Sequence, residues 1–181
     1  MKIRPYLVIL LMTVAMLPDT ATAQEAEKNM QIASLKAIHD ITADFVLATA
    51  EIMDEDMYAY RPTISVRTAG QQLAHIANAQ FGICSLAAGK ESPAEGNYEE
   101  IATTREEIHA AVKASFAYCE KVYNEISEDR LNEVVQFFGG ERRRDMTVSA
   151  VLSFNATHTY EHYGNLTTYL RMNGMVPPSS Q

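Results

Sequence analysis

The chain has 181 residues, of which 47% are hydrophobic and 21% are charged, and its formal net charge at pH 7 is −8. This length fits one domain with a full hydrophobic core. The negative charge repels phosphate backbones, and the only basic run is the short Arg142-Arg143-Arg144, so the composition argues against a nucleic-acid-binding protein.

The N-terminal segment has the pattern of a bacterial export signal. Lys2 and Arg4 precede a nearly unbroken apolar run over 6–17, and Ala21-Thr22-Ala23 matches the small-x-small cleavage pattern. We therefore expect residues 1–23 to be a signal peptide and the mature protein, 24–181, to be periplasmic or secreted. The apolar run is shorter than the roughly 20 residues that span a membrane, so we expect no stable membrane span after cleavage. An uncleaved anchor helix is the alternative.

Four stretches then show apolar residues every three or four positions, which predicts amphipathic helices at about 27–53, 68–88, 103–126 and 147–173. Two of the predicted helices begin with a capping box, which pairs Thr68 with Gln71 and Thr104 with Glu107. Glycine ends the second and the fourth helix. We expect the acidic, tyrosine-bearing segment before Arg61-Pro62 and the polar segment around Pro93 and Gly96 to be loops.

A different pattern separates the third and fourth helices. The segment 134–138 is rich in residues that favour β-strands, and Gly139-Gly140 is typical of a turn. We expect 141–145 to form the second strand, which runs back along the first. This indicates a small hairpin. The predicted fold class is all-α, an antiparallel four-helix bundle with a small β-hairpin insertion before the last helix. Such bundles often build metal sites from facing side chains.

Three histidines are spaced for one metal ion. His158 and His162 lie four residues apart on one helix face, where their Cβ atoms are about 5–6 Å apart. His75 lies off the main apolar arc of the second helix, on a neighbouring element. We predict that His75, His158 and His162 bind one divalent cation. Three protein ligands leave one coordination position open, as a catalytic site requires. Zinc, nickel, iron and manganese all accept three nitrogens, so the ligands do not identify the metal.

The remaining histidines and the two cysteines have simpler interpretations. We expect His39 and His109 to be ordinary core or surface residues. Glu106-x-x-His109 is half of a di-iron motif, but the chain has no second Glu-x-x-His, so we reject a di-iron centre. Cys84 and Cys119 fall on separate predicted helices. Export would permit a disulfide between them, and two small buried side chains are the alternative.

The sequence resembles the DinB-like superfamily (DinB/YfiT-like metalloenzymes), and the match covers nearly all of 24–181. It is carried by Tyr60-Arg61-Pro62, Gln72-Leu73-Ala74-His75-Ile76-Ala77 and the stretch from His158 to Leu166, which continues to Gly174 and Pro177-Pro178. The resemblance implies a helical bundle whose divalent metal is held by His75, His158 and His162. Relatives resemble metal-dependent transferases or isomerases that use low-molecular-weight thiols. Such thiols are mainly cytosolic, so the export signal argues against a thiol cosubstrate here.

Two hypotheses follow for the function. The first is an exported metalloenzyme, a metal-dependent transferase or hydrolase on a small molecule. The second is a non-catalytic metal-binding or structural bundle. An open coordination site would favour the first, and a fourth protein ligand the second. We expect Asn155 to support the histidines and Glu161 to be solvated. We expect the run from Arg142 to Arg144 to lie on the hairpin's solvated return strand, with a role in holding an anionic substrate as the alternative. The sequence identifies neither substrate nor catalytic residues and leaves a homodimer open.

Overall fold

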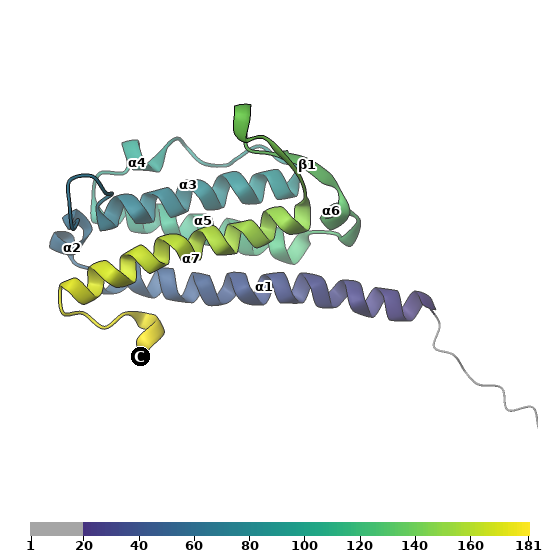
Figure 1. The fold of residues 1–181 in the computed structure, drawn as a ribbon, viewed down its shortest axis with the longest axis horizontal. Helices are drawn as coiled ribbons and strands as arrows, with labels where there is room; N and C mark the ends of the chain where they lie inside the picture. The colour runs from purple at the N-terminus through teal and green to yellow at the C-terminus, as the bar shows by residue number, and fades with distance from the viewer. Residues whose placement is uncertain (1–19) are drawn as a thin grey trace, which may run out of the picture.

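The computed structural model describes residues 20–181. Four long helices lie side by side, α1 (Thr20–Ile52), α3 (Ala69–Ala88), α5 (Arg105–Glu125) and α7 (Val148–Met172), as Figure 1 shows. The helical bundle is therefore confirmed. Most of the expected signal peptide lies outside the described residues, and the expected cut after Ala23 falls in the first turn of α1. Within 20–181, no helix is long and apolar enough to cross a membrane.

Local chemistry sets the ends of the long helices. Both predicted capping boxes are present, because the hydroxyls of Thr68 and Thr104 accept from the backbone N–H groups of Gln71 and Glu107 and each N3 side chain bonds back to the cap. At the end of α3, Gly89 adopts a left-handed conformation with φ of 65°. Its N–H bonds to carbonyls of the last turn, which satisfies them.

Two segments that we expected to be loops contain a short helix each, which corrects the prediction. These are α2 (Glu55–Ala59) and α4 (Tyr98–Ile101), and a third short helix, α6 (Glu128–Asn132), follows α5. Each begins at a side-chain cap, supplied by Asp54, Asn97 and Ser127 respectively. One turn of helix is too short to show an apolar period. Two 3-10 turns, η1 (Gly140–Arg142) and η2 (Pro178–Ser180), complete the helical segments of the described chain.

The long helices do not all run in alternating directions. The first turns of α3 and α5 meet where a Cβ on Gly70 would lie 3.1 Å from Ile108. Their far ends are joined by a disulfide between Cys84 and Cys119. α3 and α5 are therefore parallel, and the connection over 89–104 must return along the length of the bundle. α4 lies on this return connection (Figure 1).

Two other pairs are antiparallel, as expected. The C-terminal end of α1 meets the start of α5, where Arg105 Nε donates to the carbonyl of Met53 at 2.8 Å. α3 and α7 are joined at two levels, by Gln72 with His162 and by Gln80 with Asn155. The residue numbers of these partners rise along α3 and fall along α7, so the two helices run in opposite directions.

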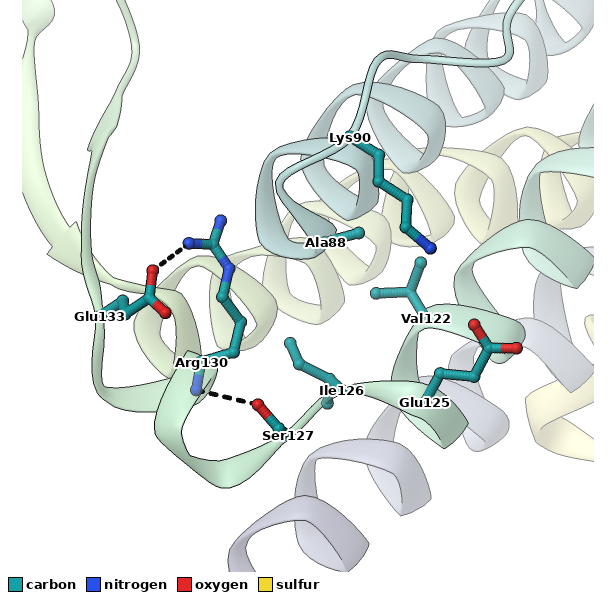
Figure 2. A pocket seen from close by; sticks show the side chains of 8 residues that line it. All are labelled: Ala88, Lys90, Val122, Glu125, Ile126, Ser127, Arg130 and Glu133. Atoms are coloured by element: carbon teal, nitrogen blue, oxygen red, sulfur yellow. Dashed lines mark hydrogen bonds and ion pairs between the residues drawn. The ribbon is translucent and has the colours of Figure 1, made fainter.

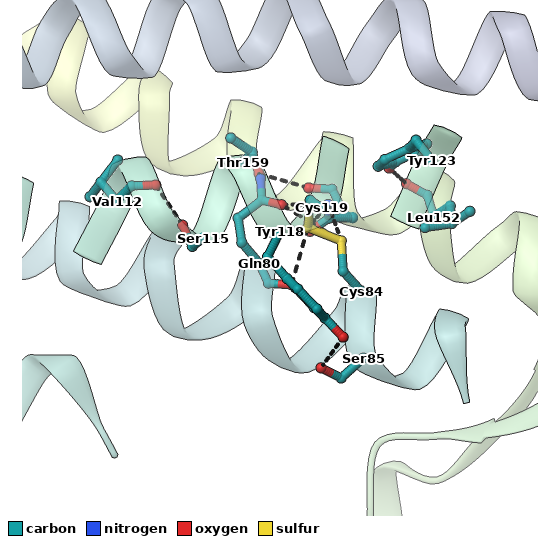
Figure 3. Close-up of a disulfide and its surroundings, with 11 residues drawn as sticks. Gln80, Cys84, Ser85, Val112, Ser115, Tyr118, Cys119, Tyr123, Leu152 and Thr159 are labelled. Atoms are coloured by element: carbon teal, nitrogen blue, oxygen red, sulfur yellow. Dashed lines mark hydrogen bonds between the residues drawn. A yellow bond between two sulfur atoms is a disulfide. The ribbon is translucent and has the colours of Figure 1, made fainter. Parts of the chain in front are cut away.

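The disulfide lies in a buried polar layer between α3, α5 and α7 (Figure 3). The Asn155 amide nitrogen lies 3.6 Å from the sulfur of Cys84 and 3.8 Å from that of Cys119, and it donates to Gln80 Oε1 at 2.8 Å. Gln80 in turn donates to Thr159 Oγ1 at 3.1 Å. Asn155 thus supports the disulfide layer and not the histidines, which corrects our expectation for this residue.

The hairpin is present, with β1 (Val134–Phe137) antiparallel to β2 (Arg144–Thr147). Its connection is longer than a two-residue Gly139-Gly140 turn, since Phe137 pairs with Arg144 and the 3-10 turn η1 lies between the strands. Phe137 is buried against Phe154 of α7, at 5.0 Å between ring centroids. This contact attaches the hairpin to the bundle beside the start of α7.

His39 is a core residue, as expected. Its side chain is 1% exposed, and its ring stacks on Tyr123 with centroids 4.5 Å apart. Burial lowers the pKa of His39 from 6.5 to about 4, because the apolar surroundings disfavour the charged imidazolium.

The stability of the fold should therefore depend on His39 in acid. Between pH 4 and 6.5 the unfolded chain binds a proton at this residue and the folded chain does not, so stability rises with pH in this window and falls on acidification. Across this window, His39 should change the free energy of unfolding by roughly 3 kcal/mol. Urea unfolding with a chelator present, from pH 7 to pH 4, should show a weaker pH dependence for His39→Phe than for wild type. His109→Phe removes a histidine outside the core and is the matched control, and equal slopes for wild type and His39→Phe would contradict the assignment.

Candidate metal centre

Three histidines converge between α3 and α7. His75, His158 and His162 each offer a ring nitrogen, and these three atoms lie within 4.8 Å of one another. His158 and His162 lie on successive turns of α7, and their Nε2 atoms are 3.1 Å apart. The ring of His75 crosses from α3, with its centroid 4.6 Å from that of His162. The structure thus brings the three residues together, and metal binding by them remains a prediction.

The geometry and chemistry of this cluster fit a divalent ion. Two nitrogens that each lie 2.0–2.1 Å from one tetrahedral ion are about 3.3 Å apart, which is close to the Nε2 separation of His158 and His162. The donor set is three imidazoles, which zinc and its neighbours accept. Within the described residues, no further His, Cys, Asp or Glu joins the cluster, so one coordination position has no protein ligand.

A carboxylate orients His75. Glu99 Oε1 lies 2.6 Å from His75 Nδ1, and because a carboxylate only accepts, the Nδ1–H donates and Nε2 is left for the cluster. The other oxygen, Oε2, accepts from Arg67 Nε at 2.7 Å. Although burial raises the pKa of Glu99, the hydrogen bonds from Arg67 and His75 outweigh it and lower that pKa overall. Glu99 is therefore ionised at neutral pH.

An amide orients His162 in the same way. Gln72 Oε1 lies 2.7 Å from His162 Nδ1, so the ring donates there and presents Nε2 inward. Burial, and then the neighbouring histidines, lower the pKa of His162 to about 4, and burial lowers the pKa of His158. Both rings are neutral at pH 7, the form that binds metals. His158 Nδ1 is buried without a partner among the described residues, and its ring packs against Phe154 at 5.7 Å.

α4 is held on α3 by a polar contact close to His75. Asn78, one turn after His75, accepts the backbone N–H of Tyr98 at 2.8 Å, and its amide nitrogen donates to Asn97, the cap of α4. The rings of Phe81 and Tyr98 add an apolar contact at 5.8 Å between centroids. These contacts fix the position of α4, and so place Glu99 over His75.

Sequence reasoning missed the residues that hold the histidines. Glu99 lies in a segment expected to be a loop, and Gln72 belongs to a matching motif but had no assigned role. Arg67 lies directly before Thr68, the cap of α3, and no sequence motif gives it a role. No local spacing links Glu99 to His75, since their contact depends on the return connection. The other two histidines stay apart from the centre: His39 is in the core, and His109 lies 3.3 Å from Glu51.

A separate pocket at the α6 end of the bundle does not include these histidines (Figure 2). Its most prominent polar side chain, Arg130, donates to the carbonyls of Leu86 and Ala87, both at 2.9 Å, and pairs with Glu133. The arginine therefore satisfies the last carbonyls of α3, which is a structural role.

Glu161, expected to be solvated, is exposed.

Residues 39–166 match the family model of the DinB superfamily. A DinB-like protein from Bacillus subtilis has a similar structure, with a TM-score of 0.65, 19% identity, and coverage of 82% of this chain and 98% of that one. A DinB-like protein from Bacillus cereus gives 0.63 and 22% identity, over 76% of this chain and 89% of that one. No curated protein matches the chain.

A mycothiol-dependent maleylpyruvate isomerase is also similar in structure. The TM-score is 0.62 at 18% identity, and the match covers 75% of this chain but only 60% of the isomerase. At this level of identity the likeness concerns the fold.

Replacing any one ligand should reduce metal affinity. We expect His75→Ala, His158→Ala and His162→Ala each to cost at least about 10–100-fold, the loss typical of weaker changes around a metal site. At free metal 100 times the wild-type dissociation constant, wild type should gain about 2.7 kcal/mol of stability, and the variants should lose at least about half of this gain. Metal content and melting temperature measure both effects. His109→Ala is the control and should behave as wild type. Wild-type occupancy in the first three variants would exclude the site.

The carboxylate that orients His75 should matter without touching the ion. Glu99→Gln weakens the hydrogen bond to His75 Nδ1 and removes the charge, so we expect about 10–100-fold weaker metal binding. Competition with a chromophoric chelator measures the affinity. Glu100→Gln makes the same chemical change on the next residue, whose carboxylate contacts Asn97 and no histidine. Equal affinities in the two variants would show that Glu99 has no such role.

Proposed function

The chain belongs to the DinB superfamily, and from that premise we propose that it is an exported, metal-dependent transferase or hydrolase that acts on a small molecule. The observation that carries the proposal is the cluster of His75, His158 and His162, with no fourth protein ligand in the described chain. A metal site with three protein ligands is the arrangement of catalytic zinc centres, whereas structural sites are closed by four.

In this proposal each nearby residue has a defined task. His75, His158 and His162 hold the ion, while Glu99 and Gln72 fix two of the three rings through their Nδ1 atoms. A bound zinc, nickel, iron or manganese ion supplies a Lewis acid, which polarises a substrate oxygen or acidifies water or a thiol. Three imidazole ligands leave the positive charge of the ion undiminished, since none of them brings a negative charge of its own.

The likeness to the mycothiol-dependent isomerase supports small-molecule chemistry for this bundle. It does not extend to the choice of thiol. Two fifths of that isomerase has no counterpart in the match, and an exported protein would work away from cytosolic thiols. We therefore propose chemistry on a small molecule, and not a thiol cosubstrate, as the property shared with that enzyme.

Export rests on the sequence of the first 23 residues and is consistent with the disulfide between Cys84 and Cys119, since such bonds persist in oxidising compartments. The proposal places the mature chain, 24–181, in the periplasm or outside the cell. N-terminal sequencing of the native protein should begin at Gln24. An intact Met1 on a cytoplasmic protein would refute export and leave the metal centre untouched.

The coordination of the bound metal tests catalysis. The mature protein, purified from its native source without an affinity tag, should contain about one divalent ion per chain. X-ray absorption should show three imidazole nitrogens and one exchangeable light ligand, which added azide displaces. That metal form should then turn over substrates in a panel of small esters, amides and transfer reagents, and lose this activity on chelation. Four protein ligands, or azide without effect, would support the non-catalytic bundle instead.

A further inference from the structure

Arg67 presents an unused pair of donors beside the metal centre. Its Nε bonds to Glu99, which also holds His75, so the guanidinium and the ligand ring share one carboxylate. Within 20–181, no hydrogen bond is made by the two terminal nitrogens of Arg67. The side chain of Arg67 is 40% exposed.

The position of Arg67 is fixed at its backbone as well. Its carbonyl accepts from Tyr169 Oη at 3.0 Å, and the next residue, Thr68, caps α3. Both ends of the side chain are therefore held, one by α7 and α3 and the other by Glu99. A guanidinium that is held in this way loses little conformational entropy when it binds a ligand.

A bound divalent ion would make this face positive in an otherwise acidic protein. Arg67 and Glu99 neutralise each other, so a bound divalent ion would leave this face with a net charge of about +2. An arginine fork with free donors suits a carboxylate or phosphate, which it binds through two parallel hydrogen bonds.

We propose that Arg67 binds the anionic group of the substrate, so that the substrate of this enzyme is a small molecule with a carboxylate or phosphate close to its reacting end. This inference rests on the proposed function, because the metal would hold that reacting end. Arg67 acts here as a substrate-binding residue. Its hydrogen bond to Glu99 leaves the two terminal nitrogens available for the anion.

Two matched metal-binding probes can test the assignment. Succinic monohydroxamate and butyrohydroxamate share the same metal-binding head and chain, but one ends in a carboxylate and the other in a methyl group. Calorimetric titration of the zinc-loaded protein should show about tenfold tighter binding of the carboxylate probe, the effect of one charge-assisted hydrogen bond. Arg67→Gln should abolish this preference and keep the affinity for butyrohydroxamate per loaded site. A ratio within one variant cancels any change in metal affinity.

The controls separate the alternatives. Arg142→Gln removes the same charge from the hairpin connection, where the guanidinium lies over Phe138, and it should retain the preference. If Arg142→Gln abolishes the preference, the hairpin binds the anion and the assignment to Arg67 is wrong. If the zinc form binds both probes equally, or Arg67→Gln keeps the preference, the inference fails while the metal centre stands. If the protein takes up no divalent metal, the proposed function fails and the inference with it.

Discussion

The register between α3 and α7 is the constraint on which the centre depends. Gln72 meets His162 at one level, and Gln80 meets Thr159 and Asn155 at the next. Buried polar groups cost free energy when they lose a partner, about 1–3 kcal/mol each. A slip by one helical turn, about 5.4 Å, would leave several of them unpaired at once. These polar contacts therefore fix the axial position of α3 relative to α7, and with it the position of His75 relative to His158 and His162. Apolar packing alone would fix this register less precisely.

The parallel pairing of α3 and α5 has a direct effect on the centre. Because both helices start at the same end of the bundle, the chain between them must return along α3. That return passage is where Asn97 caps α4 and where Glu99 meets His75. With the shorter connection of an alternating bundle, this stretch would not lie over α3. The cluster thus combines histidines from packed helices with a charged residue supplied by the connection.

Periodic and local features could be predicted from the sequence, whereas contacts made across the bundle could not. The capping boxes at Thr68 and Thr104 and the shared face of His158 and His162 depend on residues three or four apart, so they are visible in one segment. The partner of His75 lies 24 residues away on a single turn of helix, and neither spacing nor composition marks it. Asn155 is an example of a contact that the sequence does not reveal. It lies on the same face of α7 as His158 and His162, as expected. Because it is one helical turn before His158, however, it contacts Gln80 and the disulfide and not the histidines.

The disulfide has a consequence for metal selection. The chain has two cysteines, and the bond between Cys84 and Cys119 uses both, so it offers no thiolate to an arriving ion. Thiolates favour soft ions such as copper(I) and bind zinc strongly, and a free pair in the core would compete with the histidines or hold the wrong metal. The cluster offers imidazole nitrogens, and the affinity of such a site for divalent metals follows the Irving–Williams series. Which of these metals would bind then depends on their supply. With the two sulfurs bonded to each other, the described core has no free thiol that would compete with the three rings for an ion.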